Sequence, residues 1–451
     1  MRRREGQAES GRASVVYGVE AKPPPAEAIP LGIQHVLAML LGNITTPLLV
    51  AGALSLAVED TALLIQMALL MAGIATVIQS YPLGPVGARL PIVMGTSIAF
   101  LGAIIGVSLE YGLAAVFGAC LVASVVEIAL GFSIARVRSA FPPLVTSIVV
   151  MLIGLTLIPV GMDYAAGGPG AADYGSVANL GLAGLVFLVT LALNQFGRGF
   201  ARHASILLGM LCGYAVAVAA GRVSFSPVAE AGWFTLPRFA PFGLEFESGP
   251  ILVIGFIYVI STMETIGDIA GTAAALDRDP TDRELRGGLV ADGVMSGLAS
   301  LVSAFPNTSY SQNVGLINFT GVVSRHVTAI GGIFLVALGL IPKVGALFAT
   351  IPAAVIGGGG LIMFAMIFAS GTAIFHRGVD ADRRSLVILA VSVALGLGVE
   401  LRPEILAQAP QWANSFFGSG LIAGGLAALV LNLSLPRSDG PSRPPANLTC
   451  P

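Results

Sequence analysis

Apolar runs long enough to cross a bilayer recur along almost the whole chain. A helix needs about 20 predominantly apolar residues to span the hydrocarbon core. Only 11% of the 451 residues are charged and 55% are hydrophobic, whereas soluble domains carry about 25% charged residues. So few charges cannot cover a water-soluble surface on a chain of this length. The sequence therefore predicts an all-α polytopic membrane protein.

We expect about fourteen transmembrane spans between two polar ends. The predicted spans cover residues 31–54, 61–80, 91–108, 111–132, 142–162, 177–196, 202–221, 250–268, 287–304, 310–325, 326–342, 346–372, 384–399 and 416–434. Residues 1–30 and 436–451 are polar and contain prolines, which predicts cytoplasmic tails. The first tail lacks the small-residue cleavage pattern of a signal peptide.

The distribution of basic residues favours one orientation in the membrane. If the N-terminus is cytoplasmic, all but four of the 23 Lys and Arg residues lie on the cytoplasmic side. The four exceptions are Arg222, Arg238, Lys343 and Arg402. Cytoplasmic loops of membrane proteins are enriched in Lys and Arg. We therefore expect a multi-pass protein of the cell (inner) membrane with both termini in the cytoplasm.

The two halves of the chain resemble each other weakly. Phe141-Pro142-Pro143 opens one span, and Ile351-Pro352-Ala353 opens another roughly 210 residues later. Leu90-Pro91 and Phe305-Pro306 likewise precede comparable runs. Seven spans per half is an odd number, so the halves would be inverted relative to each other. Inverted repeats are typical of secondary transporters, whose substrate sites lie where interrupted spans of the two halves meet.

The third and tenth predicted spans are interrupted at their starts. Residues 94–100 and 309–315 are too polar and too rich in glycine for a simple helix. Backbone that is not helical is tolerated at membrane depth only where it is buried in protein or lines a cavity. We interpret both as short extended segments that present backbone groups to a ligand. The alternative is an ordinary re-entrant loop between helices.

Few ionisable residues fall inside the predicted spans, and such residues are functional candidates by default. Glu264 and Asp268 are four residues apart in the eighth span, so they share one helix face. Asp292 lies in the ninth span, where it is a candidate for proton coupling or for bridging helices, as is Asp268. His35 in the first span is expected to tie two helices together. Glu127 in the fourth span has no assigned role.

Amide side chains stand beside the second interrupted segment. Gln312 and Asn313 can both donate and accept hydrogen bonds, and the Glu264 carboxylate can accept from ring N–H groups. An amide together with a carboxylate suits a heterocycle whose edge alternates N–H and C=O groups. The residues therefore indicate a small, uncharged, nucleobase-like solute.

Four motifs together resemble the nucleobase–ascorbate transporter family of nucleobase/cation symporters, over residues 30 to 435. They are Gln34-His35 through Pro47, Glu264-Thr265-Ile266-Gly267-Asp268, Asp292-Gly293, and Gln312-Asn313-Val314-Gly315 followed by Thr320-Gly321. The resemblance implies core and gate domains that move elevator-fashion in a homodimer. The core would comprise residues 31–132 and 250–342, and the gate residues 141–221 and 345–435.

The resemblance also implies roles for individual residues. Glu264 and Gln312 would clamp the base, and the backbone around Ser97 and Ile98 would line the pocket. Asp268 and Gln312 stand where uracil carriers tend to have histidine and glutamate, which resembles the xanthine and uric acid branch. The family often has a phenylalanine at the position of Ile98, and that ring stacks on the base. Phe100 is the aromatic residue that could compensate for its absence.

Other functions fit the sequence less well. The alternatives are a uracil carrier of the same family and an anion transporter of the related sulfate-transporter fold. An anion carrier would favour a positively charged pocket, whereas Glu264 beside the tenth span is negative. An intramembrane enzyme is not expected, because protease-type motifs are absent from the sequence. The net charge of −2 gives no basic field for nucleic acid. No cofactor is expected, and the coupling ion implied for a bacterial family member is H⁺.

Overall fold

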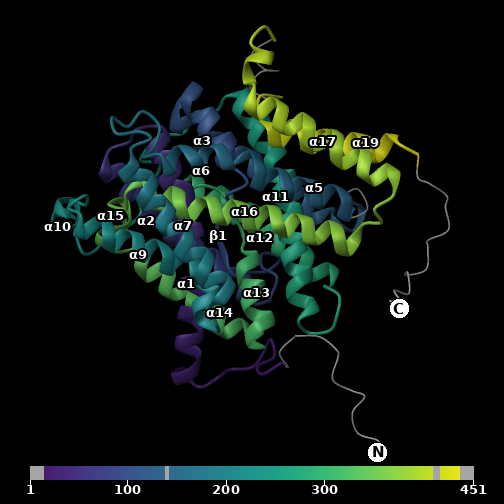
Figure 1. The fold of residues 1–451 in the computed structure, drawn as a ribbon. Helices are drawn as coiled ribbons and strands as arrows, with labels where there is room; N and C mark the ends of the chain where they lie inside the picture. Colours follow the sequence, from purple (N-terminus) through teal and green to yellow (C-terminus); the bar gives the residue numbers. More distant parts are fainter. Residues whose placement is uncertain (1–14, 138–141, 410–416, 437–451) are drawn as a thin grey trace, which may run out of the picture.

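The computed structural model describes residues 15–137, 142–409 and 417–436, and most of them are helical. The first half of the chain contains α1 (Pro25–Ala53), α2 (Val58–Ser80), β1 (Met94–Thr96), α3 (Leu101–Phe132), α4 (Ile134–Val137), α5 (Pro143–Thr156), α6 (Ile158–Ala165), α7 (Val177–Phe196), α8 (Phe200–His203) and α9 (Ser205–Ala219). Figure 1 shows β1 near the middle of the molecule, surrounded by helices.

The second half repeats this order of elements. After the short α10 (Ser226–Glu230) it contains α11 (Ser248–Ala274), α12 (Asp282–Ser300), β2 (Asn307–Ser309), α13 (Ser311–Thr320), α14 (Arg325–Gly339), α15 (Pro342–Ala349), α16 (Ala353–Gly378), α17 (Arg383–Leu401), the 3₁₀ turn η2 (Pro403–Leu406) and α19 (Gly420–Ser434). In each half, two long helices precede a short strand, and a helix follows it. The prediction of a polytopic helical fold with two repeats and two extended segments is confirmed.

Several predicted spans have different bounds in the structure. Element α3 consists of two helices that meet at Gly112, where φ is 85° and ψ is 169°, so the third and fourth predicted spans are separate helices as expected, although the third begins only at Leu101. The predicted twelfth span, 346–372, combined parts of two helices: Pro352 precedes the first residue of α16, which runs from Ala353 to Gly378. Proline lacks the N–H that a continuing helix would use, so the boundary falls there.

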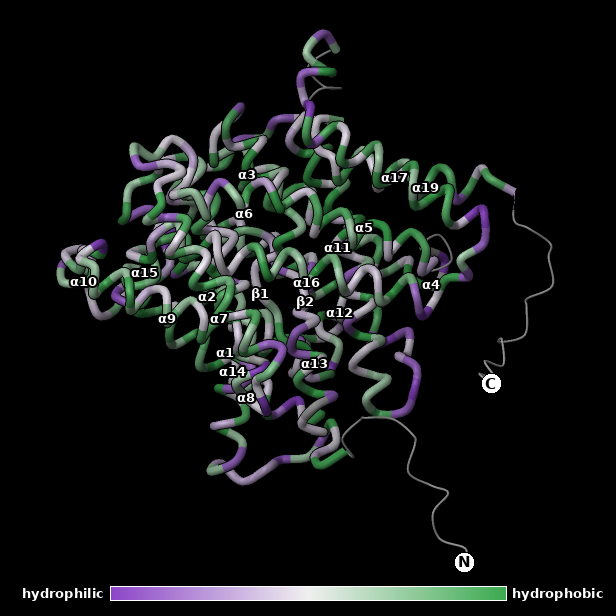
Figure 2. The backbone as a smooth tube through the Cα atoms, in the orientation of Figure 1, coloured by the Kyte–Doolittle hydropathy of each residue, from purple (hydrophilic) through white to green (hydrophobic). Residues whose placement is uncertain are grey.

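Length and apolar composition identify eight helices of the described residues as candidate membrane spans. The pair α14 and α15, bent by 82°, would add a ninth, and α9 and α19 are shorter apolar helices. The total of fourteen spans stays a prediction. Most residues of the helices are hydrophobic, and a hydrophilic stretch connects α11 to α12 (Figure 2).

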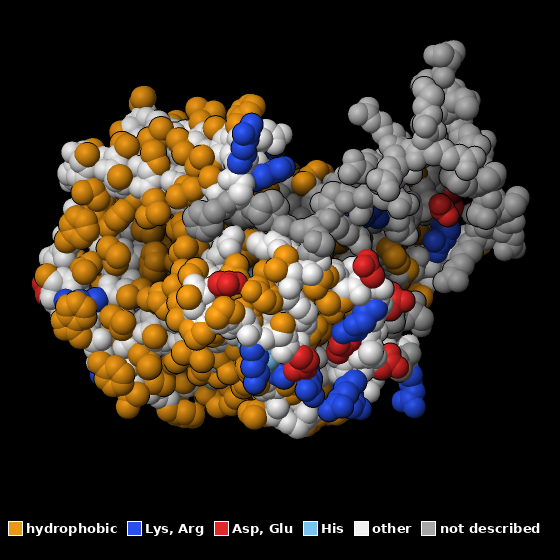
Figure 3. All heavy atoms as spheres, turned by 90° about the horizontal axis from the view of Figure 1, so that it is seen from below, with side chains coloured by type: hydrophobic (Ala, Val, Ile, Leu, Met, Phe, Trp, Pro, Cys, Tyr) orange, Lys and Arg blue, Asp and Glu red, His pale blue; other side chains and the backbone are white. Residues whose placement is uncertain are grey.

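Apolar side chains cover much of the outer surface. Val177, Leu188 and Phe196 on α7 are 88%, 64% and 83% exposed, and Leu433 on α19 is 70% exposed. Seen from below, large apolar areas contrast with acidic and basic side chains gathered on one side (Figure 3). A soluble monomer would not expose so much apolar surface. The lipid bilayer is the environment that this surface fits.

The helices pack in two groups. The first contains α1, α2, α3, α11, α12, α13 and α14 together with both strands. The second contains α5, α6, α7, α9, α16, α17 and α19. Contacts within each group are far more extensive than contacts between α1 or α11 and the second group. The predicted core and gate domains, with the boundaries given above, stay a prediction.

Part of the predicted cytoplasmic tail, residues 15–30, is ordered in the structure. Helix α1 begins at Pro25, which suits the first helical position because its missing N–H needs no partner. Before it, Tyr17 and Val323 are joined by a backbone hydrogen bond of 2.8 Å, and the Arg325 N–H donates to the Val19 carbonyl. Residues 1–14 and 437–451 lie outside the described residues.

Candidate functional site

The two extended segments pair with each other at the centre of the first helix group. Strands β1 and β2 are antiparallel, and Gly95 lies opposite Thr308 in their register. The pairing continues beyond the strands, because the Ser97 N–H donates to the Pro306 carbonyl at 2.8 Å and the Tyr310 N–H donates to the Val93 carbonyl at 3.0 Å. All six strand residues are buried. Each segment thus supplies hydrogen-bond partners for the other's backbone at membrane depth.

Helix α1 and Tyr310 hold the outer edge of β1. Asn43 accepts a hydrogen bond from the Thr96 N–H at 2.7 Å, and the Tyr310 hydroxyl donates to the Thr96 carbonyl at 2.8 Å. A Cβ atom on Gly95 would lie 2.7 Å from the Tyr310 ring, so this position has no room for a larger residue. Neither Asn43 nor Tyr310 was predicted from the sequence. The signal for Asn43 was an amide inside an otherwise apolar run.

Asp268 connects α11 to the second extended segment. Its two carboxylate oxygens accept hydrogen bonds from the Ser309 hydroxyl at 2.7 Å and the Ser311 hydroxyl at 2.6 Å. Ser309 ends β2 and Ser311 begins α13, so one carboxylate spans the junction between strand and helix. Hydrogen bonds to an ionised acceptor are about twice as strong as neutral ones. Asp268 therefore fixes the position of this junction relative to α11.

Glu264 lies on α11 and Gln312 lies on α13, and the polar groups of both side chains are free to bind a ligand. Glu264 lies one turn before Asp268 on α11, and Gln312 directly follows Ser311. Both side chains are partly buried, and no hydrogen bond joins either of them to another described residue. The carboxylate of Glu264 is within electrostatic range of Tyr310. A carboxylate and an amide without protein partners are thus available beside the paired strands.

Asn313 and His35 contact each other instead of standing free. The Asn313 amide nitrogen donates to the His35 backbone carbonyl at 2.9 Å and lies 3.1 Å from the imidazole Nδ1. Both residues are buried. The contact joins α1 to α13, while the Asn313 Oδ1 atom has no partner among the described residues.

The residues after β1 are buried in different ways. Ser97 is fully buried, and its hydroxyl has no partner among the described residues, whereas Ile98 is 8% exposed. Phe100 is fully buried and packs edge-on against Tyr258, with ring centroids 4.8 Å apart. The ring of Phe100 is therefore engaged in the helix packing and does not replace a stacking ring at Ile98.

Asp292 lies on α12, one layer behind the strands. Its Oδ2 atom accepts a hydrogen bond of 2.5 Å from the Thr265 hydroxyl, and the Thr265 oxygen lies 3.4 Å from the Thr308 hydroxyl of β2. Its Oδ1 atom has no hydrogen-bond partner among the described residues. A short series of side chains therefore connects this carboxyl group to the paired strands.

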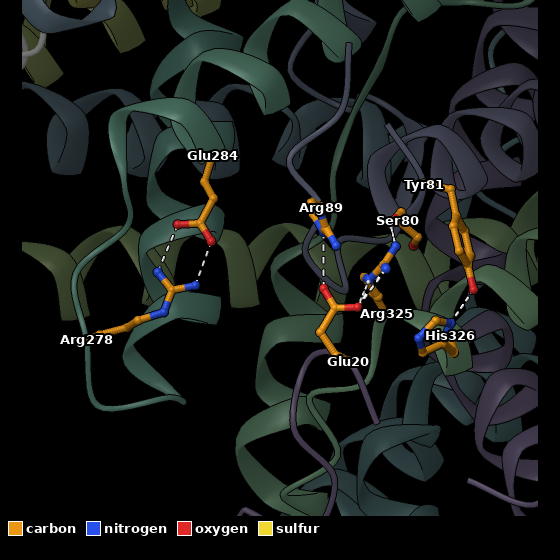
Figure 4. A network of polar contacts seen from close by, with 8 residues as sticks. All are labelled: Glu20, Ser80, Tyr81, Arg89, Arg278, Glu284, Arg325 and His326. Atoms are coloured by element: carbon orange, nitrogen blue, oxygen red, sulfur yellow. Dashed lines mark hydrogen bonds and ion pairs between the residues drawn. The ribbon is translucent and has the colours of Figure 1, made fainter. Parts of the chain in front are cut away.

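The ion pairs of the described residues lie elsewhere. Glu20 accepts from Arg89 and Arg325, and Arg278 pairs with Glu284 (Figure 4). Arg325 also donates to the Ser80 carbonyl at 2.9 Å. A cavity of about 950 Å³ lies among these groups and is lined by residues including all of those named here except Ser80. Within the described ranges, no group of three or more His, Cys, Asp or Glu residues is arranged to hold a metal ion.

Comparisons with known proteins match this chain to permeases over most of its length. A model of a permease family, Xan_ur_permease, matches residues 26–405. The chain is 37% identical to the xanthine permease of Bacillus subtilis, over 90% of this chain and 93% of that one. It is 38% identical to the uric acid permease PucJ of the same bacterium, over 89% and 91%. It is 36% identical to the xanthine permease XanP of Escherichia coli, over 95% and 96%.

Solved structures with a similar fold have a much lower sequence identity to this chain than these permeases do. The transmembrane domain of the cyanobacterial bicarbonate transporter BicA is 14% identical, with a TM-score of 0.58 over 92% of this chain and 99% of that one. The murine anion transporter Slc26a9 in the inward-facing state is 12% identical, with a TM-score of 0.64 over 92% and 68%. At these identities the similarity shows a shared fold alone.

Proposed function

The chain belongs to the nucleobase–ascorbate transporter family of permeases, and from this we propose that it takes up a purine base such as xanthine or uric acid together with protons. The observation that carries the proposal is the identity of 36–38% to xanthine and uric acid permeases over nearly their full lengths. The site geometry is compatible with such a substrate.

Glu264 and Gln312 would recognise the edge of the base. The Glu264 carboxylate would accept from two ring N–H groups, and the Gln312 amide would donate to a ring carbonyl and accept from an N–H group. Neither side chain is hydrogen-bonded to another described residue, which leaves this hydrogen-bonding capacity free for a ligand. Ser97 and Ile98 would form the floor of the pocket. Asp268, His35 and Asn313 would hold the segments in place, since their contacts are within the protein.

The packing in two groups supports an elevator-type mechanism. The paired strands and Glu264 belong to the first helix group, whose contacts with the second group are sparse. We propose that the first group, as a core domain, carries the base across the membrane by moving against the second. The protein would act in the cell membrane, with both termini in the cytoplasm, and as a homodimer.

An anion substrate is less favoured. The side chains around the paired strands include Glu264, Asp268 and Asp292, and the four ion pairs of the described residues place their cations away from them. An anion would be repelled by this arrangement. The similarity to a bicarbonate transporter and an anion transporter concerns the fold, and their substrates do not transfer at 12–14% identity.

Uptake of radiolabelled xanthine, uric acid and uracil into cells expressing the chain tests the proposal. We expect saturable uptake of xanthine or uric acid that a proton uncoupler abolishes. Glu264→Gln should remove uptake, because the neutral amide loses charge-assisted hydrogen bonds worth about 1.5–3 kcal/mol each. Glu59→Gln on the exposed first turn of α2 is the matched control and should leave uptake unchanged.

Each outcome of this assay has a defined meaning. Uracil uptake without purine uptake would keep the family and refute the purine assignment. Uptake that is insensitive to the uncoupler would refute proton coupling. Wild-type uptake by Glu264→Gln would refute the binding role of that residue, provided that immunoblots show equal amounts of both proteins in the membrane.

A further inference from the structure

A second pair of carboxyl groups is buried behind the substrate-binding residues. Glu127 on α3 and Asp292 on α12 are both 0% exposed, and their carboxyl groups interact directly. Glycines bring the two helices unusually close at this level. A Cβ atom on Gly293 would lie 2.9 Å from the Ser124 carbonyl oxygen, and one on Gly131 would lie 3.1 Å from the Leu289 Cβ. The two helices are therefore in close contact on both sides of Glu127 along α3.

Most of the oxygen atoms in this pair lack other partners. Among the described residues, neither oxygen of Glu127 and only one oxygen of Asp292 receives a hydrogen bond from outside the pair, the donor being Thr265. Buried polar groups in native proteins usually have a hydrogen-bond partner, so three unpartnered oxygen atoms in one pair of carboxyl groups require an explanation. An unpaired charge at this depth costs several kcal/mol, and two adjacent carboxylates would add mutual repulsion.

No basic side chain is among the described groups that act on these two carboxyl groups. The titratable groups that face the pair from α11 are Glu264, Asp268 and Tyr258. On α3 itself the neighbour is Cys120, which lies near Tyr258. The basic residue of α4, Arg136, lies nine residues further along the chain than Glu127. A proton is the remaining species that can neutralise one carboxylate and also supply the missing hydrogen bond.

We infer that Glu127 and Asp292 share one proton and that this pair is the proton-binding site of the transport cycle. The inference rests on the proposed function and adds the site that carries the coupled proton. Release of the proton would leave two carboxylates face to face, which only contact with water would tolerate. The proton would therefore be bound on one side of the membrane and released on the other, in states where α3 and α12 admit water at this level.

Thr265 provides the connection to the substrate. Its hydroxyl donates to Asp292 and lies 3.4 Å from Thr308 on β2, and it directly follows Glu264 on α11. A change in the charge of Asp292 changes how strongly it holds the Thr265 hydroxyl. The turn of α11 that carries Glu264 is thereby linked to the protonation of the pair, so that base and proton affect each other's binding.

Glu127→Gln tests the inference, because it keeps the size of the side chain and removes the acid. In proteoliposomes we expect counterflow exchange of labelled xanthine, which needs no net proton movement, to persist. Accumulation driven by a proton gradient should fall roughly tenfold or more, as expected for the loss of a typical coupling free energy. Xanthine-driven proton uptake, measured with a pH-sensitive dye, should disappear.

A spectroscopic measurement makes the inference independent of substrate identity. Infrared difference spectra of the purified wild-type protein at neutral pH should contain the C=O stretch of a protonated carboxyl group, and Glu127→Gln should lose it. Glu127→Asp keeps an acid and should therefore keep a band of this kind at a shifted frequency; this variant tests the inference if the glutamine variant does not reach the membrane, and an unshifted band would overturn it. Ser124→Ala, one turn earlier on α3, should behave as wild type because its hydroxyl donates only to its own helix.

The results separate the inference from the proposed function. Wild-type accumulation by Glu127→Gln, an unchanged infrared band, or loss of counterflow with the protein present in the membrane would each overturn the inference. If the wild type transports no purine, the proposed function fails. The infrared band then still decides whether the pair holds a proton.

Discussion

Two acidic residues one turn apart on α11 have different surroundings. The Asp268 carboxylate accepts hydrogen bonds from two serine hydroxyls, whereas Glu264 has no hydrogen-bond partner among the described residues. A side chain that is fully engaged within the protein positions its neighbours, and one that is free can bind a ligand. Substitutions at the two positions should therefore have different kinetic signatures.

Asp268→Asn should weaken substrate binding without removing transport. The amide nitrogen of asparagine cannot accept a hydrogen bond, so either Ser309 or Ser311 loses its acceptor and the start of α13 shifts. The loss of about 1.5–3 kcal/mol corresponds to a KM roughly 10- to 100-fold higher for purine uptake, with a smaller change in maximal rate. Ser311→Ala should share most of this effect, and the double variant should be less than additive. Additive effects would show that the two side chains act separately.

The residues of the site differ in how far the sequence could reveal them. Glu264, Asp268 and Asp292 were identifiable because charged groups are rare in apolar spans. Asn43 and Tyr310 were not identified, because their importance depends on contacts with β1 that no local pattern encodes. Asn313 was identified as a candidate ligand-binding amide, but its contact with His35, 278 residues away in the sequence, could not be predicted. Convergence of distant segments is a property of the fold.

At the scale of elements, α3 joins two predicted spans through a kink. Gly112 has a φ of 85°, a conformation in which a Cβ atom is strained. The helix on one side follows β1, and the helix on the other side packs against α11 and α12. The apolar pattern revealed both segments, but the direction of the chain at Gly112 depends on a single backbone angle. The glycine thus allows the chain to change direction between the helix that follows β1 and the helix that packs against α11 and α12.

Gly112→Ala should destabilise the protein by about 1–3 kcal/mol, because backbone with φ 85° and ψ 169° is essentially restricted to glycine. Gly106→Ala is the matched control on the same helix, because its Cβ atom would meet nothing within 4 Å and its φ is not positive. Alanine at that position should be neutral or stabilising by less than about 1 kcal/mol. Thermal unfolding of the detergent-solubilised proteins measures both effects. Equal melting temperatures for the two variants would contradict the role assigned to Gly112.

The ordered segment before α1 is held partly by Glu20, which receives hydrogen bonds from Arg325 and Arg89 (Figure 4). The bond from Arg325 lowers the pKa of Glu20 below its usual value of 4.5. A lowered folded-state pKa means that the ion pair stabilises the protein above the unfolded value, and that this contribution is lost as pH falls through the folded value. Exposed pairs of this kind contribute about 0–1 kcal/mol.

Glu20→Gln should therefore lower the melting temperature slightly at pH 7 and have little effect at pH 3. Glu230→Gln, on the exposed α10, should have no effect at either pH. A difference between Glu20→Gln and wild type that grows as the pH falls would contradict the assigned direction. Differential scanning fluorimetry at several pH values provides the measurement.

At the scale of the whole molecule, the sequence was informative about class and order. The helical fold, the two repeats and the extended segments follow from apolar length, proline position and glycine content. The exact ends of helices, such as those of α16, were harder to predict, because a helix boundary depends on local backbone geometry in addition to hydropathy. The division into two packed groups depends on contacts between halves, such as those of α3 with α11 and α12. Resemblance to a family, rather than any local pattern, indicated that division.

The pairing of β1 with β2 also has a consequence for biosynthesis. The Tyr310 hydroxyl, which reaches the Thr96 carbonyl, is translated 214 residues after it. At 5–20 residues per second, that delay is roughly 10–40 s. During this time the nascent chain holds an extended segment of unpaired backbone at the ribosome-bound translocon, where lipid offers it no hydrogen bonds. Membrane insertion of the first half must therefore keep β1 hydrated or chaperoned until its partner strand emerges.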